Sequence, residues 1–193
     1  MGGVLLLLVI LLMNGCSTRN RMVDMDVAVQ KQWHQVENQY QRRMDLIPNL
    51  VAVVQNYADF EKSTLQGVVE ARAKATQVTI DPSKLDEASI QKYQAAQGAI
   101  TSSLGRLLAV AENYPNLKAN ENFMGLQTQI EGTENRISTE RMAFNQVVGD
   151  YNAAIRRFPA NIWAGIFGFN QKAFFEMKEG ADNAPDVKQL FKK

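Results

Sequence analysis

The chain has 193 residues, the length of one folded domain, and 46% of them are hydrophobic, which is enough for a packed core. Its 21 basic and 20 acidic side chains leave a net charge of +1, which argues against the uncompensated basic surface that nucleic-acid binding requires. With one cysteine and one histidine, the chain can form no intramolecular disulfide and no multi-histidine metal cluster.

The N-terminal segment is strongly apolar. Residues 4–13 read VLLLLVILLM and as a helix would span about 15 Å, half of the roughly 30 Å bilayer core. The run ends in Met13, Asn14, Gly15 and Cys16, which resembles a bacterial lipobox. We expect a signal peptide over residues 1–15, acylation of Cys16 and a lipidated tether over residues 16–23. An uncleaved N-terminal anchor and a plain buried segment remain as alternatives, because no basic residue precedes the run.

From residue 24 onward the sequence predicts helices, since helix-forming residues dominate and no period-two alternation is sustained. Apolar residues recur at steps of three and four on the first stripe. These are Trp33, Val36, Tyr40, Met44, Ile47, Val51, Val54 and Ala58.

Pro48 lies inside this stripe and allows two chain paths. An interior proline costs about 3 kcal/mol and disfavours helical geometry at Ile47. If the helix only kinks there, it runs about 80 Å and its first half lacks a partner. If the chain reverses there, four segments of comparable length result. We expect the reversal.

Two further helices follow. Asp81 and Pro82 have the residue types of an N-cap and a first helical position, and the predicted helix stops in the turn cluster of residues 113–116. The last long helix carries an apolar residue at every seventh position and closes at Pro159. That heptad position is Phe123, Ile130, Ile137, Phe144, Tyr151 and Phe158.

The predicted fold is therefore all-α, an antiparallel up-and-down four-helix bundle with long helices over residues 24–159. An aromatic C-terminal tail over residues 160–193 is expected to pack on the bundle.

Several sequence blocks resemble the LemA family. They include QRRMDLIPNLV at residues 41–51, YPNLKAN at 114–120, GTENRI at 132–137 and YNAAIRRFP at 151–159. The tail FGFNQKAFFEMKEGADNAPDVKQLF is also similar to that family. The resemblance implies a membrane-associated helical bundle with no generally established enzymatic activity. Many members carry a true transmembrane helix, whereas this chain has a shorter apolar segment and a cysteine.

A polar end of the bundle is the first candidate site. A reversal at Pro48 would bring that turn beside the turn at Tyr114–Asn116 and create a hydrated partner-binding surface. Its residues would be Arg42, Arg43, Asp45, Asn49, Asn113, Asn116, Lys118 and Asn120. The alternative is a solvated helix end with local ion pairs, each contributing about 0–1 kcal/mol.

Acidic residues on the last helix could suggest acid–base catalysis, but nothing nucleophilic or metal-binding stands near Glu131, Glu134 or Glu140. Glu134 and Arg141 instead suit an internal polar layer that fixes helix register. His34 is interpreted as structural.

The aromatic tail is the second candidate site. Ile162, Trp163, Ile166 and Phe167 would either cap the open end of the bundle or contact lipid or a protein partner. Because the tether is short, we expect Trp163 near the lipid headgroups.

The sequence thus predicts a non-enzymatic scaffold or binding module, tethered as a lipoprotein to a bacterial cell envelope and facing the periplasm or exterior. Its expected partners are the membrane and either another protein or further copies of itself. No cofactor, metal or nucleic acid is expected. A self-assembling membrane-shaping protein and an envelope enzyme are the alternatives.

Overall fold

The computed structural model describes residues 2–57 and 60–176, with side chains omitted for Gly2 and residues 4–12. The described ranges form helices without any strand, which confirms the predicted all-α class. The helices are α1 (Gly2–Gln55), α2 (Lys62–Thr76), α3 (Glu87–Ala111), α4 (Pro115–Lys118), α5 (Glu121–Arg156) and α6 (Ala160–Phe167).

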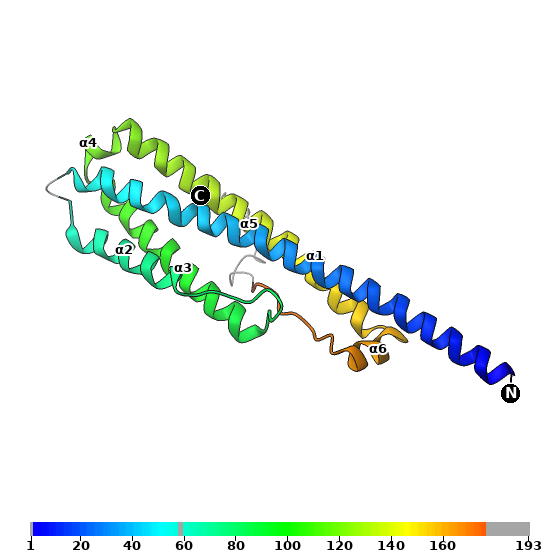
Figure 1. Ribbon diagram of the computed structural model, residues 1–193. Coiled ribbons are helices and arrows are strands. Elements are labelled where there is room, and N and C mark those ends of the chain that lie inside the picture. Colours follow the sequence, from blue (N-terminus) through cyan, green and yellow to red (C-terminus); the bar gives the residue numbers. More distant parts are fainter. Residues whose placement is uncertain (1, 58–59, 177–193) are drawn as a thin grey trace, which may run out of the picture.

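The four longer helices, α1, α2, α3 and α5, alternate in direction along the chain (Figure 1). Helix α1 packs mainly along α5, and α2 packs mainly along α3. The N-terminal end of α1 projects beyond the other helices (Figure 1). The apolar stripe predicted on α1 is buried from Trp33 to Val54, because it faces these neighbouring helices.

The predicted reversal at Pro48 is wrong, because α1 continues through this residue to Gln55. A proline at position 48 deprives the Met44 carbonyl of its usual helical donor. Arg72 of α2 supplies a replacement, since its Nε donates to the Met44 oxygen over 3.0 Å. Ile47 and Leu50 on either side of the proline are buried in the core. Packing and one long-range hydrogen bond thus offset the cost of the proline, and the chain reverses after Gln55 instead.

Two other helix ends differ from their predicted positions. Asp81 does not cap a helix, and its carboxylate instead accepts from Ser83 N in a turn. Helix α3 begins five residues later, where the Asp86 side chain accepts from Ser89 N. At the other end, α5 stops at Arg156. Phe158 therefore leaves the heptad stripe and is 81% exposed, whereas the five preceding heptad residues are buried.

The segment predicted as a tether, residues 16–23, is part of α1. No glycine or proline interrupts the sequence between Cys16 and Val23, so nothing prevents the helix from continuing. Seven helical residues span about 10 Å, less than half of their extended reach. None of the helices in the described ranges has an apolar stretch long enough to cross a membrane.

The core consists of two hydrophobic clusters. A distal cluster is built from buried residues between 44 and 54, 60 and 75, 100 and 117, and 123 and 130. A proximal cluster, nearer the N-terminus of α1, is built from buried residues between 22 and 40, 85 and 93, 137 and 155, and 164 and 175. The boundary between the two clusters is polar.

An extended strap, residues 168–176, returns along the proximal cluster after α6. Its Phe175 ring stacks on Trp33 at 5.7 Å and meets Phe144 edge-on at 5.2 Å. Side-chain amides hold the strap backbone: Asn145 donates to the Phe175 carbonyl and accepts from its N–H. Asn152 does the same for Lys172. The strap therefore covers Trp33 of α1 and Phe144 of α5 in the proximal cluster.

Candidate functional site

A buried polar layer separates the two hydrophobic clusters, and Arg43 of α1 lies at its centre. Arg43 Nη1 donates to Glu134 Oε2 of α5 over 2.6 Å and to Thr101 Oγ1 of α3 over 2.9 Å. Its Nη2 donates to the side-chain and backbone oxygens of Gln97 over 2.9 and 3.1 Å. Only 1% of the Arg43 side chain is exposed, against 45% for Glu134. One guanidinium group thus joins three helices.

Each helix places its polar residue between apolar neighbours. Arg43 falls between Tyr40 and Met44, and Gln97 falls between Tyr93 and Ile100, all of which are buried. On α5, Glu134 stands between Ile130 and Ile137, two residues of the heptad stripe. The three polar residues meet because their helices are packed at the same level. The predicted polar layer at Glu134 is therefore present, but its cation is Arg43 rather than Arg141.

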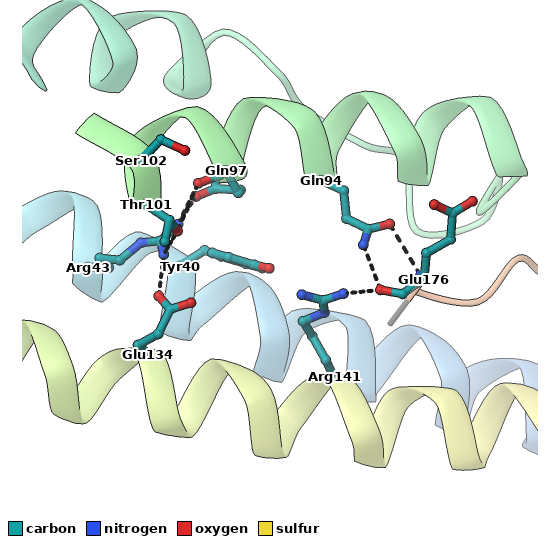
Figure 2. Close-up of a pocket in the computed structure, with 10 residues that line it drawn as sticks. Tyr40, Arg43, Gln94, Gln97, Thr101, Ser102, Glu134, Arg141 and Glu176 are labelled. Carbon is teal, nitrogen blue, oxygen red and sulfur yellow. Dashed lines mark hydrogen bonds and ion pairs between the residues drawn. The ribbon is translucent and has the colours of Figure 1, made fainter. Parts of the chain in front are cut away.

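An open cavity of about 540 Å³ lies over this layer. Helix α1 contributes Tyr40 and Arg43, α5 contributes Glu134 and Arg141, and the strap contributes Glu176. Figure 2 shows Arg43 and Glu134 directed toward each other, beside Gln97 and Thr101 of α3. The remaining wall is also from α3: Gln94, Gly98 and Ser102.

The end of the strap forms one side of the cavity. The Glu176 carbonyl accepts from Arg141 Nη2 over 2.5 Å and from Gln94 Nε2 over 3.0 Å (Figure 2). The Arg141 guanidinium also lies 4.9 Å from the centre of the Phe175 ring. These contacts hold Arg141 at the edge of the cavity.

The phenol groups beside the layer are protonated at neutral pH. Burial raises the pKa of Tyr40, although the positive charges of Arg141 and Arg43 oppose this effect. Burial also raises the pKa of Tyr93, and the negative charge of Glu37 adds to it. Each phenol therefore offers a neutral O–H group rather than a phenolate.

The residues predicted to share a polar end lie in three places. Asn113, Asn116, Lys118 and Asn120 are at the turn between α3 and α5, where Tyr57 donates to the Asn116 carbonyl and Asn120 donates to Tyr57. Lys118 pairs with Glu112, and the Asn120 side chain caps α5 by accepting from Phe123 N. The predicted residues of α1 lie elsewhere.

Arg42, Asp45 and Asn49 are exposed on α1, about 9–20 Å before its end. Arg43 is buried in the polar layer, so the prediction that it belongs to a hydrated end is wrong. The error follows from the misplaced reversal, because α1 continues to Gln55 and carries these residues into the middle of the molecule. His34 is exposed and lies 3.1 Å from Glu37, as a structural surface residue would.

Helix α6 forms a second candidate surface beside the first part of α1. Trp163 lies so close to Gly15 that a Cβ atom at position 15 would come within 2.8 Å of the indole ring. The Arg19 guanidinium lies 5.7 Å from the centre of the Phe167 ring. These contacts place α6 alongside Cys16, which is exposed.

The outer side of this region is apolar and exposed. We call it the apolar collar, which consists of Phe158, Ile162, Ile166 and Phe167. Ile162 and Ile166 are one helical turn apart and share a face of α6, while Trp163 is half-buried against α1. Arg156 and Arg157 are exposed just before the collar. The aromatic tail thus packs through one face and presents apolar side chains on the other.

Comparison with known proteins identifies the family. The family model described as "LemA family" matches residues 32–189. The chain belongs to the LemA family. This match covers all four longer helices in part or in full, together with α6 and the strap.

Individual relatives of this LemA family chain share about a quarter of its residues. Magnetosome protein MamQ 1 of Paramagnetospirillum magneticum is 28% identical over 189 residues, which cover 89% of this chain and 70% of MamQ 1. MamQ of Magnetospirillum gryphiswaldense is 26% identical over the same shares. Protein LemA of Metamycoplasma hominis is 27% identical over 138 residues, 72% of this chain and 59% of that protein. None of these names carries an enzymatic activity.

Sequence reasoning missed most of the cavity lining, including Tyr40, Gln94, Gln97, Thr101 and Ser102. A usable signal was present in three apolar stripes, each interrupted by one polar residue at a position that the period assigns to the core. Gln97 in particular takes the place of an apolar residue four positions after Tyr93. Among the described residues, no group of histidine, cysteine or acidic side chains could hold a metal ion.

Proposed function

We propose that this LemA family chain is a membrane-tethered helical scaffold or binding module without catalytic activity, in which a four-helix bundle is anchored through an acyl group on Cys16. The proposed location is a bacterial cell envelope, with the bundle facing the periplasm or exterior. In this proposal the polar turn at the far end of the bundle is available to a hydrated protein partner.

The apolar collar is the observation that carries the proposal. Four large apolar side chains are exposed within residues 158–167, and Trp163 of α6 lies against Gly15, the neighbour of Cys16. Clustered exposed apolar side chains are typical of surfaces that contact a membrane or a protein. Exposed Arg19, Arg156 and Arg157 lie next to the collar, and such residues attract anionic headgroups by about 1 kcal/mol each near a membrane surface. A bilayer entered by the acyl chains on Cys16 would therefore meet the collar.

The anchor is tested by replacing the acylated atom. We expect Cys16→Ser to abolish incorporation of radiolabelled palmitate and lipoprotein-type cleavage in a bacterial host, because a serine hydroxyl does not provide the thioether that lipoproteins carry. Ser17→Ala is the matched control and should label like the wild type. Labelling of the Cys16→Ser variant at wild-type level would contradict the lipid anchor.

The collar is tested by its depth in the bilayer. We expect brominated lipids to quench Trp163 when the full chain is reconstituted in liposomes, because Trp163 lies between the collar and α1 at the level of Cys16. Trp33 is fully buried in the proximal cluster and can remain in place. The quenched fraction should disappear in Trp163→Phe. If brominated lipids leave the emission of the folded wild type unchanged, the aromatic tail does not contact the bilayer and only caps the bundle.

A further inference from the structure

The cavity over the polar layer contains one guanidinium group, that of Arg141, which pairs with no carboxylate of the described residues. Arg43 is neutralised by Glu134, to which it is bound directly. In residues 2–57 and 60–176, no carboxylate lies within ion-pair distance of Arg141. The Glu176 carboxylate accepts from Gln91, outside the cavity, and points away from Arg141 in Figure 2. The lining thus holds two guanidinium groups and two carboxylates, and among the described residues Arg141 is the guanidinium that neither carboxylate pairs.

The polar layer under the cavity also leaves a hydrogen-bond donor unsatisfied among the described residues. Arg43 Nε is buried and has no hydrogen-bond partner in the described part of the chain. Leaving a buried donor unsatisfied costs about 1–3 kcal/mol. The Tyr40 hydroxyl and the exposed Ser102 hydroxyl add further donors to the wall. A ligand that matches this lining must supply acceptors to these donors, and a negatively charged acceptor would pair with Arg141.

We propose that this cavity is a binding site for a small organic carboxylate, with Arg141 as the residue that pairs with the carboxylate group. A planar guanidinium matches a carboxylate through two parallel N–H···O bonds. Arg141 donates one N–H to the Glu176 carbonyl and hydrogen-bonds the Tyr40 hydroxyl, and its remaining N–H groups would serve the ligand. The volume of about 540 Å³ lies within the usual 300–1,000 Å³ of small-molecule sites. The proposal does not depend on the membrane tether.

The test uses glutarate as the probe and the full chain in detergent micelles. We expect calorimetry to detect glutarate binding, and amide NMR shifts to map to residues 94–102 and 134–141. Glutaramide, a neutral molecule of nearly the same shape, should bind at least about tenfold more weakly, because it lacks the charge-assisted bond to Arg141. Inorganic phosphate should not displace glutarate.

Two variants and one control complete the test. Arg141→Gln should weaken glutarate binding at least about tenfold, while Arg136→Gln, an exposed arginine elsewhere on α5, should leave it unchanged. Because Arg141 also holds the strap, Ser102→Phe serves as a second variant that fills the cavity from its exposed rim and should abolish binding. Unchanged affinity in both cavity variants, equal binding of glutaramide, or binding of phosphate in preference to glutarate would overturn the proposal.

Discussion

Replacing Phe144 by alanine should destabilise the protein by about 3–5 kcal/mol, because this buried ring is central to the proximal cluster. Phe144 is fully buried. Its ring meets Trp33 edge-on at 5.7 Å and Phe175 edge-on at 5.2 Å. Truncation would remove both aromatic contacts and leave a cavity between α1, α5 and the strap. The neighbours are themselves held by other helices, so they cannot close the space completely.

Thermal or urea denaturation measures this effect, and the melting temperature should fall by roughly 10 °C. His34→Ala is the control, because His34 is exposed on α1 and its contact with Glu37 is a surface ion pair. Equal melting temperatures for Phe144→Ala and His34→Ala would show that the heptad face of α5 is not the one buried against α1.

The buried faces of the helices could be predicted from sequence because they depend on local periodicity. Residues at steps of three and four must share a helix face, and seven of the eight residues predicted on the α1 stripe are buried, with Ala58 outside the described residues. The heptad on α5 was equally readable up to Tyr151. The prediction for Phe158 is wrong because α5 ends at Arg156. The end of a helix depends on capping and packing more than on the apolar period.

The continuation of the helix through Pro48 could not be predicted, because the side chain that replaces the lost hydrogen bond is distant in sequence. The donor that replaces the missing backbone bond is Arg72, 28 residues after Met44 and on another helix. Nothing in the local sequence around Pro48 indicates that the fold will place this donor beside the Met44 carbonyl. The lost backbone hydrogen bond follows from the local sequence, whereas the tertiary packing that offsets it does not.

The candidate site was only partly predictable for the same reason. Glu134 could be recognised as an internal polar residue, because it interrupts an apolar stripe. Its partner Arg43 is 91 positions away in sequence. Periodicity alone does not determine how two packed helices are offset along their axes. Placing the reversal at Pro48 moved Arg43 to an end of the bundle and hid the pairing. The cavity depends on the additional approach of the strap, which had no periodic signal.

The pairing of Arg43 with Glu134 leads to a second large effect, which is non-additive. Glu134→Leu should destabilise the protein by about 2–3 kcal/mol, because it leaves the Arg43 guanidinium buried without a counter-charge. This value lies below the roughly 3–5 kcal/mol that breaking a buried ion pair usually costs. The reason is that 45% of the Glu134 side chain is exposed, so water already screens part of the interaction.

The double variant Arg43→Met/Glu134→Leu should be more stable than Glu134→Leu alone. Methionine keeps much of the arginine stem volume and removes the buried charge, and apolar replacements of buried ion pairs are often neutral or stabilising. Gln97 and Thr101 would each lose a donor in this variant, so full wild-type stability is not expected. Urea denaturation of the wild type, both single variants and the double variant gives the coupling free energy, which we expect to exceed about 1 kcal/mol.

Glu131→Leu is the matched control, because Glu131 is exposed on the same helix and its carboxylate accepts only from Gln127 among the described residues. Its free energy of unfolding should stay within about 0.5 kcal/mol of the wild type. If the effects of Arg43→Met and Glu134→Leu simply add in the double variant, the two charges do not stabilise each other. The polar layer would then be stabilised by the hydrogen bonds that Arg43 donates to the neutral groups of Gln97 and Thr101.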